Sequence, residues 1–493
     1  MRGMPTTAAP RGFTRRFRPQ WFGGFGVQAV AISIILLIPC FWQRRIQAVD
    51  LGSHIYNSWL AQQIELGKAP GFRIAPISTN VLFDIVLTRL FESFGAEVAQ
   101  GIAVSVSVLI FFWGAFAFVT AVNGTRRWFL VPCLMMLSYG WVFHMGFSNF
   151  YLSCGLSLWA LALSLKRGIG PALAAIVLLA VAYTAHAIPV AWAVCVIVYS
   201  RIAERLSWRL KQLLLALSAC GIVLAHLWVF HNYRSFSSFH QALEASGIDQ
   251  VWVFGFKYIA ISVMLGTLWG FLLLRVSHMR GYRALAGDTY FQLCALMALG
   301  ILLSPTHVDL PQYRVALSFI TERMTLLHGV LICVFLGSAD PPRWLRVGFL
   351  PLAAIYFPFL YVDTAALNDV ERQMEALTAN LSLQDRVISS FEDPSARVQL
   401  WGHNIDRVCL GRCISYANYE PVSLQFRVQA TGANPLVADI PSGGAMQQGG
   451  YVVKESDLPL YQVTLCGSDL CLRKLAAGDV TKHDLLSVTP VVW

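Results

Sequence analysis

Long apolar runs constrain this chain more than any other feature. The run FGVQAVAISIILLIPCFW, residues 25–42, has no charged side chain, and similar runs recur through the first 362 residues. A helix needs about 20 mainly apolar residues to cross the hydrocarbon core of a bilayer. Only 13% of the 493 residues are charged, against about 25% in a soluble domain. The sequence therefore predicts a multi-spanning membrane protein.

Eleven segments are candidates for membrane-spanning helices, so we expect an all-α transmembrane bundle over residues 1–362. They lie at 25–42, 97–122, 128–146, 149–166, 170–186, 187–200, 211–230, 252–274, 288–304, 315–337 and 344–362. The fifth and sixth are read as two short helices, broken between His186 and Pro189. Within a first outer loop at 43–96, the amphipathic segment 79–96 predicts a helix lying at the membrane interface.

The distribution of charge predicts the orientation of the bundle. With the N-terminus inside, the inner segments hold 18 Lys and Arg residues and the outer loops hold 7. Basic residues concentrate on the cytoplasmic side of membrane proteins. An odd number of spans places the C-terminal part outside, as in a bacterial inner-membrane protein. The net charge of +10 is thereby explained by topology, and we expect no nucleic-acid partner.

Residues 363–493 predict a stalk helix followed by a small, mostly β domain outside the membrane. The short runs RVQLW, VSLQFRVQA, YVVKE, YQVTLCG and LCLRKLA predict strands. Four cysteines of this region form two close pairs, Cys409 with Cys413 and Cys466 with Cys471 in sequence. An oxidising compartment favours disulfides, with the connectivity open. A zinc site is the weaker alternative, because the usual C-x2-C spacing is absent.

The first outer loop is unusually rich in polar groups. If residues 50–67 form a helix, Asp50, His54 and Asn57 fall on one face at i, i+4 and i+7. Such a helix can lie flat at the interface and present a polar stripe. The alternative for Asp50 is a purely structural role as the N-cap of the helix, where Asp is favoured.

The order of a basic N-terminus, one span and an outer loop that opens with an acid resembles the GT-C glycosyltransferases. The stretch VDLGSHIYNSWLAQQIELG carries this resemblance, with Asp50 at the acidic position. It implies an inverting membrane enzyme that uses polyprenyl-phosphate-linked sugars. It also implies that Asp50 is the catalytic base or orients the acceptor. This chain has a single Asp where many members have a pair of acids.

Further polar residues are predicted at the outer ends of the spans or inside them, and these are candidates for substrate binding. They are Asn149, His186, His307, Asp309, Arg314, Glu322 and Arg323. Charged groups in spans are costly and are often functional. We expect Arg314 or Arg323 to bind the donor phosphate, with His54 and His307 as candidates for phosphate or a divalent metal. No cofactor is required, and the residues form no metal motif.

Two other classes of function remain open from the sequence. A secondary transporter would explain the helix break at Pro189 and the charges of Glu322 and Arg323 as a midplane site. A non-catalytic membrane scaffold would present the outer β domain to partners. Against the transporter, the sequence has no paired repeats, and its polar groups cluster at one face.

Overall fold

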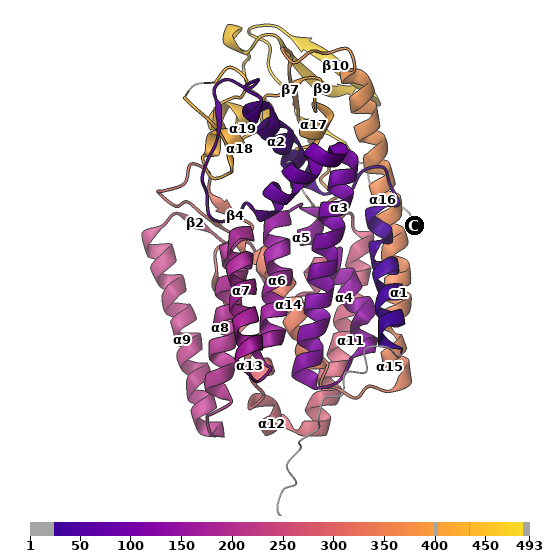
Figure 1. Ribbon diagram of the computed structural model, residues 1–493, viewed down its shortest axis with the longest axis vertical. Helices are drawn as coiled ribbons and strands as arrows, with labels where there is room; N and C mark the ends of the chain where they lie inside the picture. The colour runs from indigo at the N-terminus through magenta and orange to yellow at the C-terminus, as the bar shows by residue number, and fades with distance from the viewer. Residues whose placement is uncertain (1–23, 399–402, 433, 487–493) are drawn as a thin grey trace, which may run out of the picture.

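The computed structural model of the chain describes residues 24–398, 403–432 and 434–486, and it is mostly helical (Figure 1). The basic residues before residue 24, which support the predicted orientation, lie outside the described residues. A helical bundle occupies one end of the molecule in Figure 1, and most of the small β sheets lie at the other. The apolar helices and the small sheets of the C-terminal part thus belong to opposite ends of the molecule.

Several helices are apolar, and four described stretches are long enough to cross a membrane by length and composition. The four are α3 (Leu82–Asn123), α9 (Trp208–Asn232), α11 (Lys257–Arg280) and Arg343–Thr378, which joins α15 (Arg343–Val347) to α16 (Phe349–Thr378). Shorter helices complete the bundle: α1 (Phe25–Leu37), α4 (Val131–Ser138), α5 (Trp141–His144), α6 (Ser148–Ser164), α7 (Ile169–Ala185), α8 (Ala187–Ala203), α12 (Tyr282–Ala286), α13 (Thr289–Leu303) and α14 (Ile320–Leu336).

The structure follows some predicted helix limits and changes others. α7 and α8 meet at His186, as predicted. α3 is broken at Gly95, whose φ of 76° and ψ of 171° separate the predicted interfacial segment from the second span. The third span is not one helix, because α4 ends at Ser138 and α5 begins at Trp141. At Gly140, between them, a Cβ atom would lie 2.7 Å from the carbonyl oxygen of Gln250. The last span and the stalk are one continuous helix, α16.

The C-terminal part mixes strands with short helices, so the expectation of a mostly β domain was too simple. Its largest sheet has the order β10-β9-β5-β7, with β5 parallel to both β9 and β7. The strands are β5 (Arg386–Ser389), β6 (Phe391–Glu392), β7 (Ile414–Ser415), β8 (Val428–Ala430), β9 (Leu460–Cys466), β10 (Asp469–Leu475) and β11 (Asp484–Leu485). Between them lie α17 (Asn404–Val408), α18 (Glu420–Ser423) and α19 (Ile440–Gln448).

Some of the strands predicted in this region are confirmed, and others are not. β9 and β10 form the hairpin expected from YQVTLCG and LCLRKLA. VSLQFRVQA yields strand only at β8, because its first residues belong to α18. YVVKE contributes a single bridge, from Val452 to Val480. In RVQLW, Arg397 and Val398 are not in a strand, and the remainder lies outside the described residues. The structure joins Cys409 to Cys413 and Cys466 to Cys471 by disulfides.

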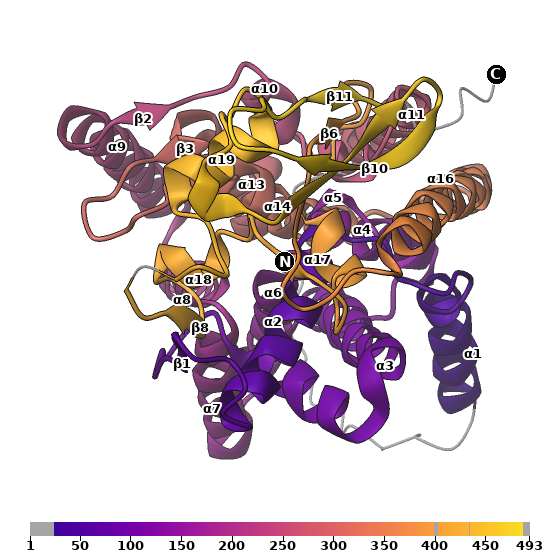
Figure 2. The same cartoon turned by 90° about the horizontal axis from the view of Figure 1, so that it is seen from above.

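The first outer loop is built into the C-terminal part rather than lying flat beside it. Its strand β1 (Phe72–Ile74) pairs antiparallel with β8. Its helix α2 (Val49–Glu65) is buried through most of its first three turns, and α17 packs against it. Figure 2 shows α2 lying among α3, α6 and α17. The prediction that this helix lies flat at the membrane interface was therefore wrong, because the C-terminal part packs on it. We call that part, from residue 379 onwards, the outer domain, after the side of the membrane predicted for it.

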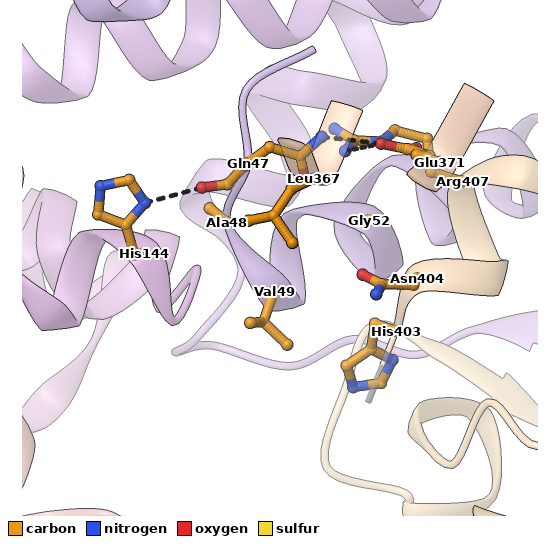
Figure 3. Close-up of a pocket in the computed structure, with 10 residues that line it drawn as sticks. All are labelled: Gln47, Ala48, Val49, Gly52, His144, Leu367, Glu371, His403, Asn404 and Arg407. Carbon is orange, nitrogen blue, oxygen red and sulfur yellow. Dashed lines mark hydrogen bonds and ion pairs between the residues drawn. The ribbon is translucent and has the colours of Figure 1, made fainter. Parts of the chain in front are cut away.

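A buried ionic cluster fixes the outer domain to the bundle. Glu371 of α16 receives two hydrogen bonds from Arg407, at 2.6 and 2.7 Å, and pairs with Arg45 at 2.8 Å. Burial alone would raise the pKa of Glu371, but Arg407 and Arg45 outweigh it and lower that pKa. Figure 3 shows Glu371 and Arg407 of this cluster beside Gln47, with His403, Val49 and Gly52 close by. The start of α2 is thus held between the bundle and the outer domain.

Candidate active site

A cavity of about 800 Å³ lies where the bundle meets the outer domain. The start of α2, the turn between α7 and α8, the loop 310–319 and the segment 419–426 contribute to its walls. Five residues singled out from the sequence line it together, although they come from four separate parts of the chain: Asp50, His54, Asn149, His186 and Arg323.

Asp50 is the second residue of α2. The N-cap is Ala48, and it makes no side-chain capping bond, so the N-cap hypothesis for Asp50 was wrong. The backbone N–H of Asp50 donates to the carbonyl oxygen of Met145 at 3.1 Å. Gly146 has a φ of 79°, and a Cβ atom there would lie 2.5 Å from the nitrogen of Asp50. Glycine at this turn lets the chain before α6 approach α2 closely enough to fix Asp50.

The carboxylate of Asp50 accepts no hydrogen bond from any described residue. Its nearest charged neighbour is His403, whose Nε2 lies 3.9 Å from Oδ1. The other ring nitrogen of His403, Nδ1, is 2.8 Å from Oδ2 of Asp406. Burial alone would lower the pKa of His403, but Asp406 and then Asp50 outweigh it and raise that pKa to about 9. A protonated imidazole therefore stands beside the free carboxylate at neutral pH.

A second glycine, Gly52, allows His403 to lie this close to α2. In α2, Gly52 lies against the backbone of His403, and a Cβ atom there would be 2.8 Å from the carbonyl oxygen of His403. A backbone oxygen held in the docked outer domain cannot move away as the end of a flexible side chain can. The absence of a side chain at residue 52 therefore sets how closely α17 packs on α2.

His54 is held by an acid that the sequence analysis did not select. Its Nδ1 lies 2.6 Å from Oδ1 of Asp84 in α3. The other oxygen of Asp84 accepts a hydrogen bond from Nδ2 of Asn149 at 2.7 Å. Burial alone would lower the pKa of His54, but Asp84 outweighs it and raises that pKa to about 9. His54 therefore adds a second positive charge to the cavity, while Asn149 orients its partner.

Asn57 lies on the same helix but does not line the cavity. Its Nδ2 donates to Oε2 of Glu420 at 2.6 Å, and the hydroxyl of Ser53 donates to Oε1 at 2.7 Å. Burial raises the pKa of Glu420 to about 7, despite the opposing charges of His54 and His403. Asn57 thus holds a cavity-lining carboxyl group of the outer domain.

Arg323, on α14, provides the cation on the side of the cavity formed by the helical bundle. Its Cζ lies 3.8 Å from the centroid of the Phe147 ring, within the range of a cation–π contact. Its Nε is buried without a hydrogen-bond partner, and the guanidinium forms no ion pair with any described residue. His186 accepts a bond from the backbone N–H of Ile188 at its Nδ1, at 3.2 Å. A neutral His186 ring therefore carries its proton on Nε2.

The remaining predicted residues lie elsewhere. His307 and Asp309 pair with each other at 3.2 Å near β3 (His307–Val308) and are not among the cavity-lining residues. Arg314 points to a second hollow in the outer domain. Glu322 precedes Arg323 on α14, but its carboxylate accepts a bond from Thr321 and does not line the cavity. The charges in the tenth span are therefore separated rather than paired as a midplane site.

Sequence reasoning missed Asp84, His403, Tyr419 and Glu420. Asp84 had a usable signal, since it is an acid within a segment expected to lie against apolar surroundings. The other three lie in irregular or short helical segments of the outer domain, where no periodic pattern marks a buried residue. Burial and the charge of Asp50 raise the pKa of Tyr419 well above its usual range, so its hydroxyl stays protonated.

Searches for similar proteins and for metal sites add no further assignment. Within the described residues, no three or more His, Cys, Asp or Glu side chains gather in a group that could hold a metal ion. No protein-family model, curated protein or solved structure matches the chain. The chemistry of the cavity therefore rests on its own residues.

Proposed function

We propose that the chain is an inverting membrane glycosyltransferase, working at the outer face of a bacterial inner membrane. It would transfer a sugar from a polyprenyl-phosphate-linked donor to the hydroxyl group of an acceptor. The observation that carries this proposal is that two groups with unused hydrogen-bonding capacity line one cavity. Asp50 offers a carboxylate without a hydrogen bond, and Arg323 offers a guanidinium without an anion.

Asp50 would act as the base. The hydroxyl of the acceptor donates a hydrogen bond to the carboxylate and loses its proton to it as the oxygen attacks the anomeric carbon. The bond from that carbon to the phosphate oxygen breaks, and its electron pair leaves with the polyprenyl phosphate. Attack from the side opposite the leaving group inverts the anomeric centre.

Arg323 and His186 would stabilise the leaving group. A guanidinium forms strong, charge-assisted hydrogen bonds to phosphate, and its planar donors match phosphate geometry. The Nε2–H of a neutral His186 adds a neutral donor. Negative charge grows on the phosphate as the sugar leaves, so these donors stabilise the transition state more than the bound substrate.

The surroundings of the cavity suit a lipid-linked donor. Phe150, Ala187 and Ile188 line it at the N-terminal ends of α6 and α8. Further along these helices from the cavity, α7 and α8 expose Val177, Val181, Val194 and Val198 on their outer surfaces. A polyprenyl chain can lie along such an apolar surface while its phosphate reaches Arg323.

The cavity around Asp50 holds two positive charges, because the raised pKa values of His403 and His54 keep both rings protonated at neutral pH. Glu420 is a less suitable base, because Ser53 and Asn57 already donate to both of its oxygens. Asp50 is the cavity-lining carboxylate that an acceptor can reach without breaking such bonds.

The proposal is tested with the purified full chain in liposomes. The donors are undecaprenyl-phosphate-linked mannose, glucose, galactose and arabinose, each radiolabelled in the sugar, and the acceptor is a bacterial envelope glycan fraction. We expect label from at least one donor to leave the lipid-linked pool and enter that fraction. No transfer from any of the four, with protein that is folded, would count against the proposal.

A further inference from the structure

A second hollow, of about 1120 Å³, lies in the outer domain next to the first. We call it the outer groove. Its walls come from β1, from residues 430–432 and 434–442, and from the segment 451–457. None of the groups assigned to catalysis lines it.

The outer groove and the cavity share a wall. Leu424 lines both hollows, and it sits at the end of α18 with a φ of 63°, a conformation that side-chain-bearing residues adopt rarely. In the loop 310–319, Tyr313 and Val315 line the cavity, whereas Arg314 between them lines the groove. Nη1 of Arg314 donates to the carbonyl oxygen of Val422 at 3.3 Å, which ties this loop to α18. The two hollows are therefore neighbours, with Leu424 between them.

The unbalanced charge of the outer groove is positive. Arg73, Arg314 and Lys454 line it, and none of them forms an ion pair with a described residue. Asp457 also lines it, but both of its oxygens are occupied, by the hydroxyl of Tyr416 at 3.0 Å and that of Tyr451 at 2.8 Å.

The other acid of the groove, Asp439, is engaged through one of its two oxygens. Oδ1 of Asp439 caps α19 by accepting the backbone N–H of Ser442 at 2.8 Å. Three cations thus stand against two carboxylates in the lining of the groove, so its net charge is positive.

We propose that the outer groove binds the acceptor and that the acceptor is an anionic saccharide, with carboxylate groups along its chain. This inference rests on the proposed function, since it names the substrate that Asp50 deprotonates. Hydroxyl and amide side chains of Thr431, Asn434, Ser442 and Ser456 line the groove beside the two tyrosines. Hydrogen-bonding groups beside aromatic rings suit sugar hydroxyls and sugar ring faces, and the cations suit carboxylates.

The test uses the full-length chain in nanodiscs and direct binding of a fluorescent hexagalacturonate at low salt. The Arg314→Gln/Lys454→Gln double variant removes two cations of the groove. Lys474→Gln is the matched control, because Lys474 is an exposed cation of the same domain, on β10, outside the groove. Maltohexaose serves as the neutral hexasaccharide, and inorganic phosphate as a free anion.

We expect hexagalacturonate to bind the wild-type chain and Lys474→Gln alike, and the double variant at least ten-fold more weakly. Maltohexaose should bind much more weakly than hexagalacturonate. Unchanged affinity in the double variant, equal affinity for maltohexaose, or no binding to the wild-type chain overturns the proposal. Displacement by inorganic phosphate as effective as that by unlabelled hexagalacturonate also overturns it, since the groove would then be an ion site.

This experiment separates the groove from the transfer reaction. It needs no donor and no turnover, so Asp50→Asn should bind hexagalacturonate like the wild-type chain. Groove binding together with full transfer activity in Asp50→Asn would reject the proposed catalytic role while leaving the groove assigned. If Asp50→Asn loses transfer but hexagalacturonate does not bind in the groove, the catalytic role of Asp50 stands and the groove assignment is rejected.

Discussion

Nε2 of His403 lies 3.9 Å from Oδ1 of Asp50, although the two residues are more than 300 positions apart in the chain. The contact joins the outer domain to the first helix after the first apolar run. It places a histidine held by Asp406 beside a carboxylate that accepts no hydrogen bond from the described residues. The docking of the outer domain thereby brings an imidazole to the proposed base.

The first prediction concerns the pH dependence of this docking. The pKa of His403 is raised from 6.5 to about 9, so its stabilising effect is fully present below about pH 6.5. It is lost as the pH rises through about 9, and the full shift corresponds to on the order of 3 kcal/mol. We expect the thermal unfolding temperature of the wild-type chain to fall between pH 6.5 and 9.5.

His403→Gln provides the control, because glutamine keeps polar atoms but does not titrate. The variant should lose less stability over that pH range than the wild-type chain does. His54 titrates in the same direction, through Asp84, so it contributes to the slope that remains. If the unfolding temperature falls with pH equally in the wild-type chain and in His403→Gln, His403 does not cause the fall.

A second prediction follows from the close packing of α2 on the outer domain. Gly52→Ala places a methyl group 2.8 Å from the carbonyl oxygen of His403, so the two segments must separate. We expect faster hydrogen exchange in α17 and α2, with a destabilisation of about 1–3 kcal/mol, which is typical of overpacking.

Gly444→Ala is the matched control, since Gly444 lies in α19 and has no atom within 4 Å of an added Cβ. That variant should exchange like the wild-type chain outside α19. Similar exchange rates in α17 for Gly52→Ala and the wild-type chain would mean that the close approach is not needed.

Much of the bundle could be predicted from sequence because its signal is local. Each apolar run marks a helix by composition alone, and the break at His186 was visible from Pro189. The short helices α4 and α5 were not separable, because Gly140 is required by the approach of Gln250, which is distant in sequence. The outer domain was predicted least well, since its strands are short and its helices α17 and α18 span single turns.

For the candidate site too, local features could be predicted from the sequence, and contacts between distant segments could not. Asp50 and His54 could be placed on one helix face from their spacing of four residues. Their partners Asp84 and His403 could not be assigned, because each contact depends on how separate elements pack. Arg314 and Arg323 looked equivalent in sequence, yet Leu424 and the loop 310–319 put them in different hollows.

The orientation of the chain gives a third prediction. Ala477 is exposed in the outer domain, and Tyr282 is exposed in α12 at the opposite end of the molecule (Figure 1). In intact cells, a membrane-impermeant maleimide should label Ala477→Cys and should leave Tyr282→Cys unlabelled until the membrane is permeabilised. The wild-type chain gives the background from its own cysteines. Labelling of Tyr282→Cys in intact cells would contradict the proposed topology.

A fourth prediction concerns Arg323. Arg323→Gln removes the proposed phosphate ligand but keeps a polar side chain of moderate length. We expect undecaprenyl phosphate to bind this variant at least ten-fold more weakly, because a charge-assisted contact is worth about 1.5–3 kcal/mol. Arg372→Gln, at an exposed site on α16, should bind like the wild-type chain. Equal affinity of all three proteins would remove Arg323 from the donor site.

The most direct test of the central claim is sugar transfer by Asp50→Asn, compared with Glu420→Gln and Asp369→Asn at equal protein levels. Asparagine preserves shape, and the N-cap of α2 is Ala48, so the helix should keep its stability. If Asp50 takes the acceptor proton, transfer should fall about a hundred-fold or more in Asp50→Asn. Asp369→Asn, at an exposed position, should transfer at the wild-type rate, and Glu420→Gln should lose far less than Asp50→Asn. Wild-type transfer by Asp50→Asn would contradict the account.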